Sequence, residues 1–289
     1  MFSMSRILVP VDFSARSTGA ARYAEALAEH YGSKVTMLHV LPPPHYEFTA
    51  LEGGALALGE WYGTRKENVQ EELVRHLSEH LPELQAERLI LQGDPARRIC
   101  EFAEKGADLI VISTHGYGPF RRFILGSVTT KILHDAHCPV WTGVHMEDAP
   151  AVDRIHFSTV MAAVDLGPES EKAIGWALEF ARTQKAKLIL VHATPSLEGS
   201  AGEYFDPNWR GVLRRQATAR LTDLLQKLGG EADIMVEAGD VPYVVDGLAR
   251  ERKADLLVIG RGSVAGVFGR LRANAYAIIR NSPCPVVSV

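Results

Sequence analysis

The stretch Asp108-Leu109-Ile110-Val111-Ile112-Ser113-Thr114-His115-Gly116 is followed, after nine intervening residues, by Gly126-Ser127-Val128-Thr129. The apolar, β-branched residues 108–112 predict a short buried strand. Loop glycines let backbone approach a ligand closely, and Gly126-Ser127 predicts a helix start that Ser127 caps. A glycine-containing loop that leads into a helix N-terminus is a common phosphate site, although a plain capped turn between strand and helix has the same pattern.

The chain repeats itself, which explains its length of 289 residues. The matching segments are residues 7–12 and 160–165, Ser17 with Ala20 and Ser170 with Ala173, 38–40 and 191–193, 93–94 and 239–240, 107–112 and 254–259, and 138–140 and 284–286. A repeat of this length indicates two copies of one domain. We expect domains at residues 1–145 and 158–289, joined by a linker at 146–157 that contains Pro150 and several charges.

Each copy alternates strands with helices. In the first copy the expected strands are Arg6–Val11, Lys34–Leu41, Glu87–Gln92, 108–112 and Val140–Val144. The expected helices are Ser14–Tyr31, Lys66–Leu81, Pro95–Lys105 and one that follows Gly126, with a long connection over Pro42–Thr64. This alternation predicts an α/β fold: two tandem, doubly wound domains with parallel sheets of five strands each. Such sheets bind ligands beyond the carboxyl ends of their strands, where Asp12, Val40 and Ser113 are expected.

Composition excludes several classes of protein. The chain is 46% hydrophobic and 23% charged with a net charge of −4 and no long basic run, so we expect no nucleic-acid partner. No apolar run is long enough for a transmembrane helix. The first six residues lead directly into a strand, which argues against a signal peptide. Cys100, Cys138 and Cys284 form no CxxC pair, and we expect a cytoplasmic protein.

Familiar catalytic and metal motifs are missing. The sequence contains no GxxxxGK[ST] loop, no GxGxxG after the first strand and no GxSxG elbow. His134 and His137 lack a third ligand at zinc spacing, so we expect no structural zinc. Asp12 ends an apolar strand and could cap the following helix. Arg121 and Arg122 could steer phosphates or simply coat the surface with charge.

The stretch from Ser113 to Ser127 resembles the nucleotide signature of the universal stress protein family: Gly-x-x-Gly, nine residues, then Gly-Ser or Gly-Thr. Gly116 is the second glycine and Gly126-Ser127 closes the motif, whereas Ser113 replaces the first glycine. The whole chain resembles a tandem protein of this family, with the ATP-binding branch in the first copy. The resemblance implies two domains that are Rossmann-like, of the adenine nucleotide alpha hydrolase type, and related by a pseudo-two-fold axis.

The same resemblance implies a set of nucleotide contacts in the first copy. They are Pro10, Val11, Asp12, Val40, Ile112, Ser113, His115, Gly116, Gly126, Ser127, Val128 and Thr129. Pro10, Val11 and Val40 would line the adenine, mostly through their backbone. Asp12 would bind the ribose hydroxyls or a Mg or Mn ion held by the nucleotide phosphates. His115 is a loop histidine for which a structural or exposed role is the alternative to catalysis.

The second copy departs from the motif. Gly260-Arg261-Gly262-Ser263 aligns with residues 113–116, but Ala273-Asn274 stands where Gly-Ser is expected, while Asp165 keeps the carboxylate. The methyl group of Ala273 would crowd a phosphate, although asparagine is still a suitable helix cap. We expect impaired nucleotide binding at this degenerate site; a competent site, a shorter nucleotide or a vestige are the alternatives.

The implied function is a tandem universal stress protein that binds ATP or another adenine nucleotide. It would act in stress response or survival signalling by changing its contacts with a protein partner that the sequence does not name. Any ATP hydrolysis would be slow. One alternative is a metal-dependent nucleotide hydrolase or nucleotidyl transferase that uses Asp12, and another is a ligand-free interaction scaffold.

Both copies end in a short apolar strand after Cys-Pro, at Val140–Val144 and Val286–Val289. Either strand would leave unpaired backbone groups if it formed an open sheet edge. In single-domain relatives by resemblance, this strand pairs with its twin across a dimer. We therefore expect the two strands to pair antiparallel within the chain, or to swap between the sheets; a homodimer of tandem chains is left open.

Overall fold

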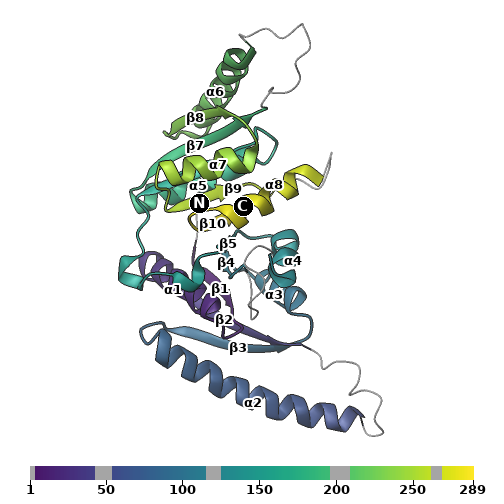
Figure 1. The fold of residues 1–289 in the computed structure, drawn as a ribbon. Coiled ribbons are helices and arrows are strands. Elements are labelled where there is room, and N and C mark those ends of the chain that lie inside the picture. Colours follow the sequence, from purple (N-terminus) through teal and green to yellow (C-terminus); the bar gives the residue numbers. More distant parts are fainter. Residues whose placement is uncertain (1–3, 43–53, 115–124, 196–208, 262–268) are drawn as a thin grey trace.

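The computed structural model describes residues 4–42, 54–114, 125–195, 209–261 and 269–289 (Figure 1). The strands of the first half are β1 (Arg6–Pro10), β2 (Lys34–Leu41), β3 (Ala86–Gln92), β4 (Leu109–Val111) and β5 (Val140–Thr142). Its helices are α1 (Ala15–Tyr31), α2 (Gly54–His80), α3 (Pro95–Ala103) and α4 (Ser127–Asp135). The predicted α/β alternation is confirmed.

The second half repeats the same order of elements. Its strands are β6 (Thr159–Ala163), β7 (Lys187–Thr194), β8 (Asp233–Ala238), β9 (Leu256–Ile259) and β10 (Val286–Ser288). Its helices are α5 (Ser170–Gln184), α6 (Trp209–Leu228), α7 (Val241–Glu251) and α8 (Gly269–Asn281). Two 3-10 helices, η2 (Met146–Asp148) and η3 (Val152–Arg154), connect the halves.

The ten strands of the described residues form one sheet, in the order β3-β2-β1-β4-β5-β10-β9-β6-β7-β8. Neighbours within each half run parallel, and β1 pairs with both β2 and β4, so the strand order reverses at β1. The terminal strands β5 and β10 pair antiparallel, with Trp141 opposite Val287. The expected antiparallel pairing is therefore confirmed. The strands do not swap, because β5 also pairs with β4 and β10 with β9.

Both faces of the sheet are covered by helices. One apolar layer includes Leu27 of α1, Leu73 of α2, Phe180 of α5 and Leu221 of α6. The layer on the other face includes Ile99 of α3, Ile132 of α4, Leu248 of α7 and Ile279 of α8. Alternate β1 residues divide between the layers, as the two-residue period of a strand requires. This is the doubly wound arrangement that the alternation predicts.

The connection between the halves packs closely on α1. A β-carbon at Gly19 would lie 1.5 Å from the Met146 carbonyl oxygen, so only glycine allows this approach. Arg16 forms a 2.8 Å ion pair with Glu147, and Arg22 Nη1 donates to the Ala149 carbonyl at 2.9 Å. The segment is therefore a packed part of the fold.

The two halves share an aromatic cluster beside the β5–β10 pair. The ring centroid of Trp141 lies 5.4 Å from that of Phe157 and 5.9 Å from that of Phe180. Trp141 and Phe180 are fully buried. Aromatic pairs at these separations add to the energy of burial, so the junction is part of the apolar core.

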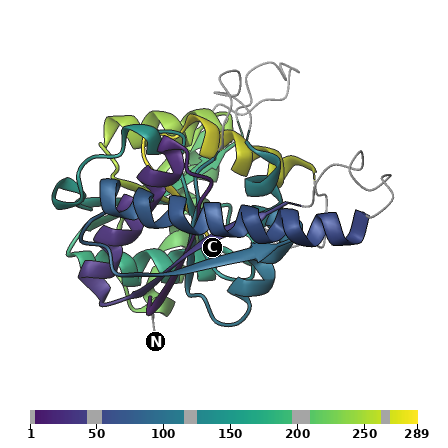
Figure 2. The same ribbon diagram turned by 90° about the horizontal axis from the view of Figure 1, so that it is seen from below.

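The predicted start of α2 was wrong. The helix begins at Gly54 and not at Lys66, so the predicted connection Pro42–Thr64 is much shorter; residues 43–53 lie outside the described part. Gly59 and Gly63 fall inside the helix, and a glycine there costs only about 1 kcal/mol relative to alanine. Gly59 and Gly63 therefore weakened the sequence pattern that predicts a helix, but they did not prevent the helix from forming. Figures 1 and 2 place α2 beyond β3, at one end of the molecule.

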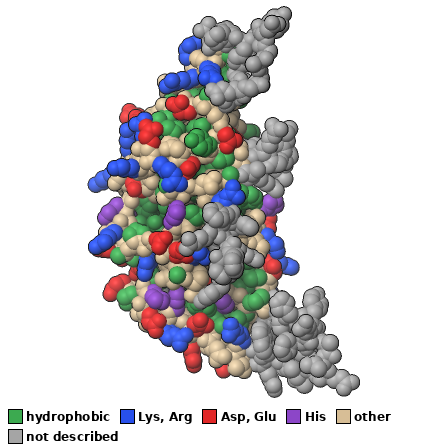
Figure 3. All heavy atoms as spheres, viewed as in Figure 1, with side chains coloured by type: hydrophobic (Ala, Val, Ile, Leu, Met, Phe, Trp, Pro, Cys, Tyr) green, Lys and Arg blue, Asp and Glu red, His purple; other side chains and the backbone are tan. Residues whose placement is uncertain are grey.

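The surface carries mixed charge. On the face shown in Figure 3, Lys and Arg side chains are interspersed with Asp and Glu. This distribution agrees with the small net charge of −4. Within the described ranges, no helix is both long and apolar enough to span a bilayer.

Candidate functional site

The predicted contacts of the first half converge at one edge of the sheet. Pro10 ends β1, Val40 is the next-to-last residue of β2, and Ser113 lies two residues after β4. Because β1 pairs in parallel with β2 and β4, these three ends lie side by side. Val11 continues the ladder, since its N–H donates to the Leu38 carbonyl at 2.9 Å. Ile112, between β4 and Ser113, is buried.

Asp12 organises the start of α1. Its Oδ1 accepts hydrogen bonds from the Ser14 N–H at 3.1 Å and from the Ser14 hydroxyl at 2.6 Å. Ser14 is itself the N-cap, and its hydroxyl accepts from the Ser17 N–H at 3.2 Å. The alternative in which Asp12 caps the helix directly is thus wrong; it holds the residue that does. Since both bonds use Oδ1, Oδ2 remains available to a ligand.

The N-terminus of α4 carries no side-chain cap. Gly126 is the N-cap residue and Ser127 the first helical residue, so the expected capping by Ser127 is wrong. The Gly126 N–H donates to the Thr114 carbonyl at 2.8 Å, and the Thr129 hydroxyl donates to the Ser113 carbonyl at 2.8 Å. These bonds fix the first turn, including Val128, beside the end of β4. The first backbone N–H groups of a helix have no acceptor within it, and they attract anions.

Several candidate residues cannot be placed. His115, Gly116, Arg121 and Arg122 lie outside the described residues. Their predicted roles are therefore untested.

His39 is a residue of this edge to which sequence reasoning gave no role. Its Nδ1 lies 2.8 Å from the Val11 carbonyl oxygen, which can only accept, so Nδ1 carries the proton. The ring stacks on Phe13 at 4.9 Å, and burial lowers the pKa of His39. His192 makes the same contact with the Val164 carbonyl at 2.7 Å. The sequence did contain a signal for this shared role, because both histidines occupy the same position of the repeat.

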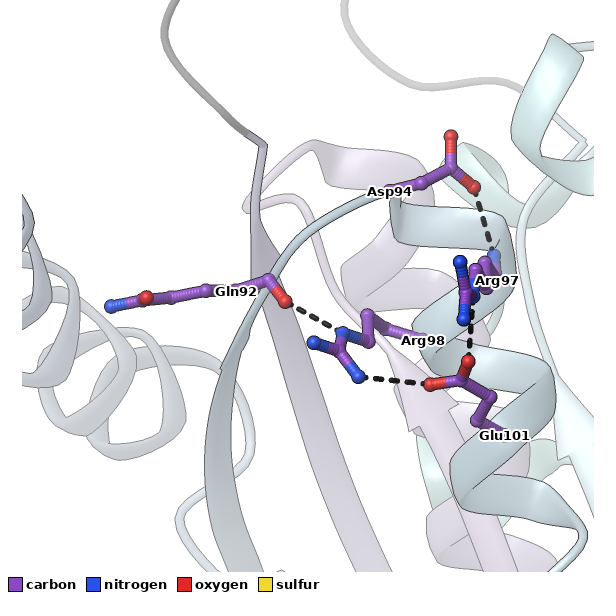
Figure 4. Close-up of polar contacts among 5 residues, drawn as sticks. All are labelled: Gln92, Asp94, Arg97, Arg98 and Glu101. Carbon is purple, nitrogen blue, oxygen red and sulfur yellow. Dashed lines mark hydrogen bonds and ion pairs between the residues drawn. The ribbon is translucent and has the colours of Figure 1, made fainter.

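The start of α3 lies at the same edge (Figure 4). Asp94 caps this helix by accepting from the Arg97 N–H at 2.9 Å, and this bond lowers the pKa of Asp94. Lys131 of α4 approaches Asp94 at 3.5 Å. The side chains of Arg97 and Arg98 both bind Glu101, at 2.7 and 2.9 Å. The two arginines are therefore held along α3 by Glu101.

The corresponding edge of the second half contains a cavity of about 260 Å³. Three of the residues predicted for the degenerate site, Asp165, Gly260 and Asn274, line it. Ala273 belongs to α8, whereas Gly262 and Ser263 lie outside the described residues. The described residues that line it are Ala163, Val164, Asp165, Glu169, Ser170, Ala173, Val191, His192, Ala193, Val241, Val245, Ile259, Gly260, Asn274, Ala275 and Ile278.

Within the described ranges, no group of three His, Cys, Asp or Glu side chains is arranged to hold a metal ion. One carboxylate, such as that of Asp12, suits Mg or Mn only when phosphate oxygens and water complete the coordination. The donor set thus fits a metal that arrives with a nucleotide.

Comparison with known proteins assigns the chain to a family. A universal stress protein from Mycolicibacterium smegmatis is 28% identical over 303 residues, which cover 98% of this chain and 96% of the relative. The crystal structure of a universal stress protein from Archaeoglobus fulgidus shares the fold, with a TM-score of 0.65 and 20% identity over 99% of this chain and 96% of that one.

A universal stress protein solved in complex with cAMP is 28% identical, covers 46% of this chain and 97% of its own, and has a TM-score of 0.32. The sequence profile of the universal stress protein family matches residues 4–142 and again residues 156–289. The chain therefore belongs to the universal stress protein family, with two family domains in tandem.

Proposed function

We propose that the first half binds ATP or another adenine nucleotide and that this binding serves a stress response. One observation carries the proposal: the N-terminus of α4, whose N-cap residue Gly126 has no side chain, is held beside the end of β4 by the Thr129–Ser113 hydrogen bond, and β4 pairs with β1, the strand that precedes Asp12. A free helix N-terminus binds phosphate well. A carboxylate on the neighbouring strand end can bind ribose hydroxyls, as in other doubly wound folds.

Different residues would contact different parts of the nucleotide. Pro10, Val11 and Val40 would contact the adenine, largely through backbone groups. Asp12 would bind the ribose hydroxyls or a phosphate-bound Mg or Mn ion. The backbone N–H groups of Ser127, Val128 and Thr129 would bind phosphate, with His115 and Gly116 contributing from the intervening loop and Ile112 and Ser113 from the strand end.

We propose binding with at most slow hydrolysis. The groups assigned here hold a ligand, and none of these roles requires a bond to break. Occupancy would change the contacts of this face with a protein partner, in the manner of a nucleotide-dependent signal. We further propose that the domains are residues 1–145 and 158–289 and that the protein works in the cytoplasm.

Native mass spectrometry of the purified chain tests this function. We expect a mass increment that corresponds to an adenine nucleotide, which acid extraction releases for identification. A chain that neither carries an adenine nucleotide nor binds added ATP would support the ligand-free scaffold instead. In a separate assay with Mg or Mn, multiple turnovers per minute would favour the metal-dependent hydrolase.

A further inference from the structure

The cavity of the second half differs in chemistry from the site proposed in the first half. We propose that it binds an unphosphorylated nucleoside and rejects nucleoside triphosphates. This inference rests on the proposed function, because it assumes that both halves use the same sheet edge for related ligands.

The floor and walls of the cavity suit a flat ring. Val164 and Ile259 lie at the carboxyl ends of β6 and β9, and Val245 of α7 and Ile278 of α8 come from the helices that cover this face. All four side chains are buried. The volume of about 260 Å³ lies just below the range of about 300–1,000 Å³ common for drug-sized ligands. A nucleoside is closer to this size than a nucleoside triphosphate.

The polar groups of the lining are mainly acceptors. Asp165 Oδ1 accepts from the Gly167 N–H at 2.8 Å and from the Ser170 hydroxyl at 3.0 Å, which leaves Oδ2 available to a ligand. Glu169 adds a second carboxylate. His192 uses its Nδ1 proton on the Val164 carbonyl, so Nε2 can only accept while the ring is neutral.

This inventory matches a ligand rich in donors. A nucleoside supplies the hydroxyl donors of its sugar and, when the base is adenine, an amino group. Two carboxylates would repel a triphosphate, since like charges brought together in a binding site are strongly unfavourable. Among the described lining residues there is no Lys or Arg to offset them.

The first half differs at the same positions of the repeat. Glu169 corresponds to Arg16, because Ser170 matches Ser17. Arg16 is positive and pairs with Glu147 at 2.8 Å, so at the position of Glu169 the first half has a cation in place of a carboxylate. The helix that follows also changes, from Gly126-Ser127 to Ala273-Asn274. Both changes act against phosphate in the second half only.

The test uses calorimetry on the full chain with Gly126→Val, a change meant to block phosphate binding in the first half. We expect a site that binds adenosine at least about tenfold more tightly than ATP, the effect of a like-charge contact. Gly260→Val, added to this variant, should remove that site from the titration. Among the described residues, a β-carbon at residue 260 would meet Glu169 and Ala173 at 3.9 and 4.0 Å, so valine should narrow the cavity without unfolding the chain.

Glu169→Gln supplies a conservative control, because it removes one charge and keeps an acceptor. It should raise ATP affinity several-fold and leave adenosine affinity nearly unchanged. ATP that binds the Gly126→Val chain as tightly as adenosine, in a manner sensitive to Gly260→Val, would overturn the inference. So would the absence of adenosine binding.

The outcomes also separate this inference from the proposed function. Adenosine binding that Gly260→Val removes, in a chain whose first site binds no ATP, would support the inference while the proposed function fails. ATP binding that Gly126→Val removes, with no adenosine binding left, would support the proposed function and reject the inference.

Discussion

The two halves share their fold down to a histidine that contacts the same backbone carbonyl, yet they differ where a ligand would meet them. In the first half, Asp12 holds Ser14, which caps α1. In the second half, Asp165 binds the Ser170 hydroxyl, and Glu169 occupies the N-cap of α5 without a side-chain cap bond. The two halves thus share a packed core, whereas a few residues at the carboxyl edge of each sheet differ, and we propose that these residues set the ligand chemistry.

The halves also differ at the junction between them. Arg261, immediately after Gly260, is partly buried and donates to the carbonyls of Ala136 and Cys138, just after α4; the bond to Cys138 is 2.5 Å. Burial lowers the pKa of Arg261. Its equivalent in the first half is Thr114, whose hydroxyl donates to the Gly143 carbonyl of its own half at 3.2 Å.

The largest effect on stability is expected from removing the Arg261 side chain at the junction. Arg261→Ala removes a charged donor from two carbonyls of the other half, and each buried acceptor left without a partner costs about 1–3 kcal/mol. We expect the free energy of unfolding in urea to fall by about 2–4 kcal/mol. Thr114→Ala, which removes the neutral bond to the Gly143 carbonyl, should cost about 1 kcal/mol.

Arg97→Ala is the matched control for Arg261→Ala. Arg97 forms an exposed ion pair with Glu101, and such pairs contribute about 0–1 kcal/mol. If Arg261→Ala were no more destabilising than Arg97→Ala, Arg261 would not stabilise the junction.

A second comparison concerns the two carboxylates. Asp12→Ala should weaken ATP binding by about 1–3 kcal/mol, the size of a lost charged hydrogen bond. Asp165→Ala should leave ATP affinity unchanged, because we assign ATP to the first half. Both variants lose hydrogen bonds to a serine near the start of a helix, so their melting temperatures should fall by similar amounts. Equal loss of ATP affinity in both variants would contradict the assignment.

The smallest effect is expected at two equivalent helix caps. Asp94 accepts the Arg97 N–H at the start of α3, whereas Asp240 caps α7 without a side-chain hydrogen bond. Asp94→Ala should therefore cost about 0.5–1 kcal/mol, and Asp240→Ala less, as measured by urea unfolding at pH 7.

The cap of α3 should also respond to acid. The Arg97 N–H lowers the pKa of Asp94 below its ordinary 3.8, so the charged form is favoured in the folded state. The contribution of the Asp94 carboxylate to the free energy of unfolding is fully present above the pKa of Asp94 in the unfolded chain. It is lost as the pH falls through the lower pKa of the folded state. The difference between wild type and Asp94→Ala should thus shrink below about pH 4. A difference that stays constant from pH 7 to pH 2.5 would show that the carboxylate charge is not involved.

Much of this architecture was predictable from the sequence. The repeat and the strand–helix alternation predicted the doubly wound fold, and the two apolar terminal strands predicted the β5–β10 pair. These features follow from patterns that recur along the chain. Pattern reasoning missed the role of Arg261, because its acceptors lie more than 120 residues away, at Ala136 and Cys138. The sequence shows no trace of such a contact.

The site was predictable in position more than in detail. Asp12, Ser113 and Gly126 were expected at one sheet edge; the pairing of β1 with β4 brings the first two together, and the Gly126–Thr114 hydrogen bond holds the start of α4 beside them. Which residue caps each helix was not predictable, since Asp12, Ser14 and Ser127 are all suitable caps and only the backbone path selects Ser14 for α1 and Gly126 for α4.

The most direct measurement of the central claim is calorimetric titration of ATP into wild type and Gly126→Val. The backbone at Gly126, with φ −62° and ψ 148°, suits valine, and its bonds to Thr114 and Thr130 use main-chain atoms only. The account predicts a first-half ATP site whose affinity falls at least about 100-fold in the variant, because the side chain blocks close approach of phosphate, with an unchanged melting temperature. ATP affinity that survives Gly126→Val in a folded chain would contradict the claim that the N-terminus of α4 binds the nucleotide.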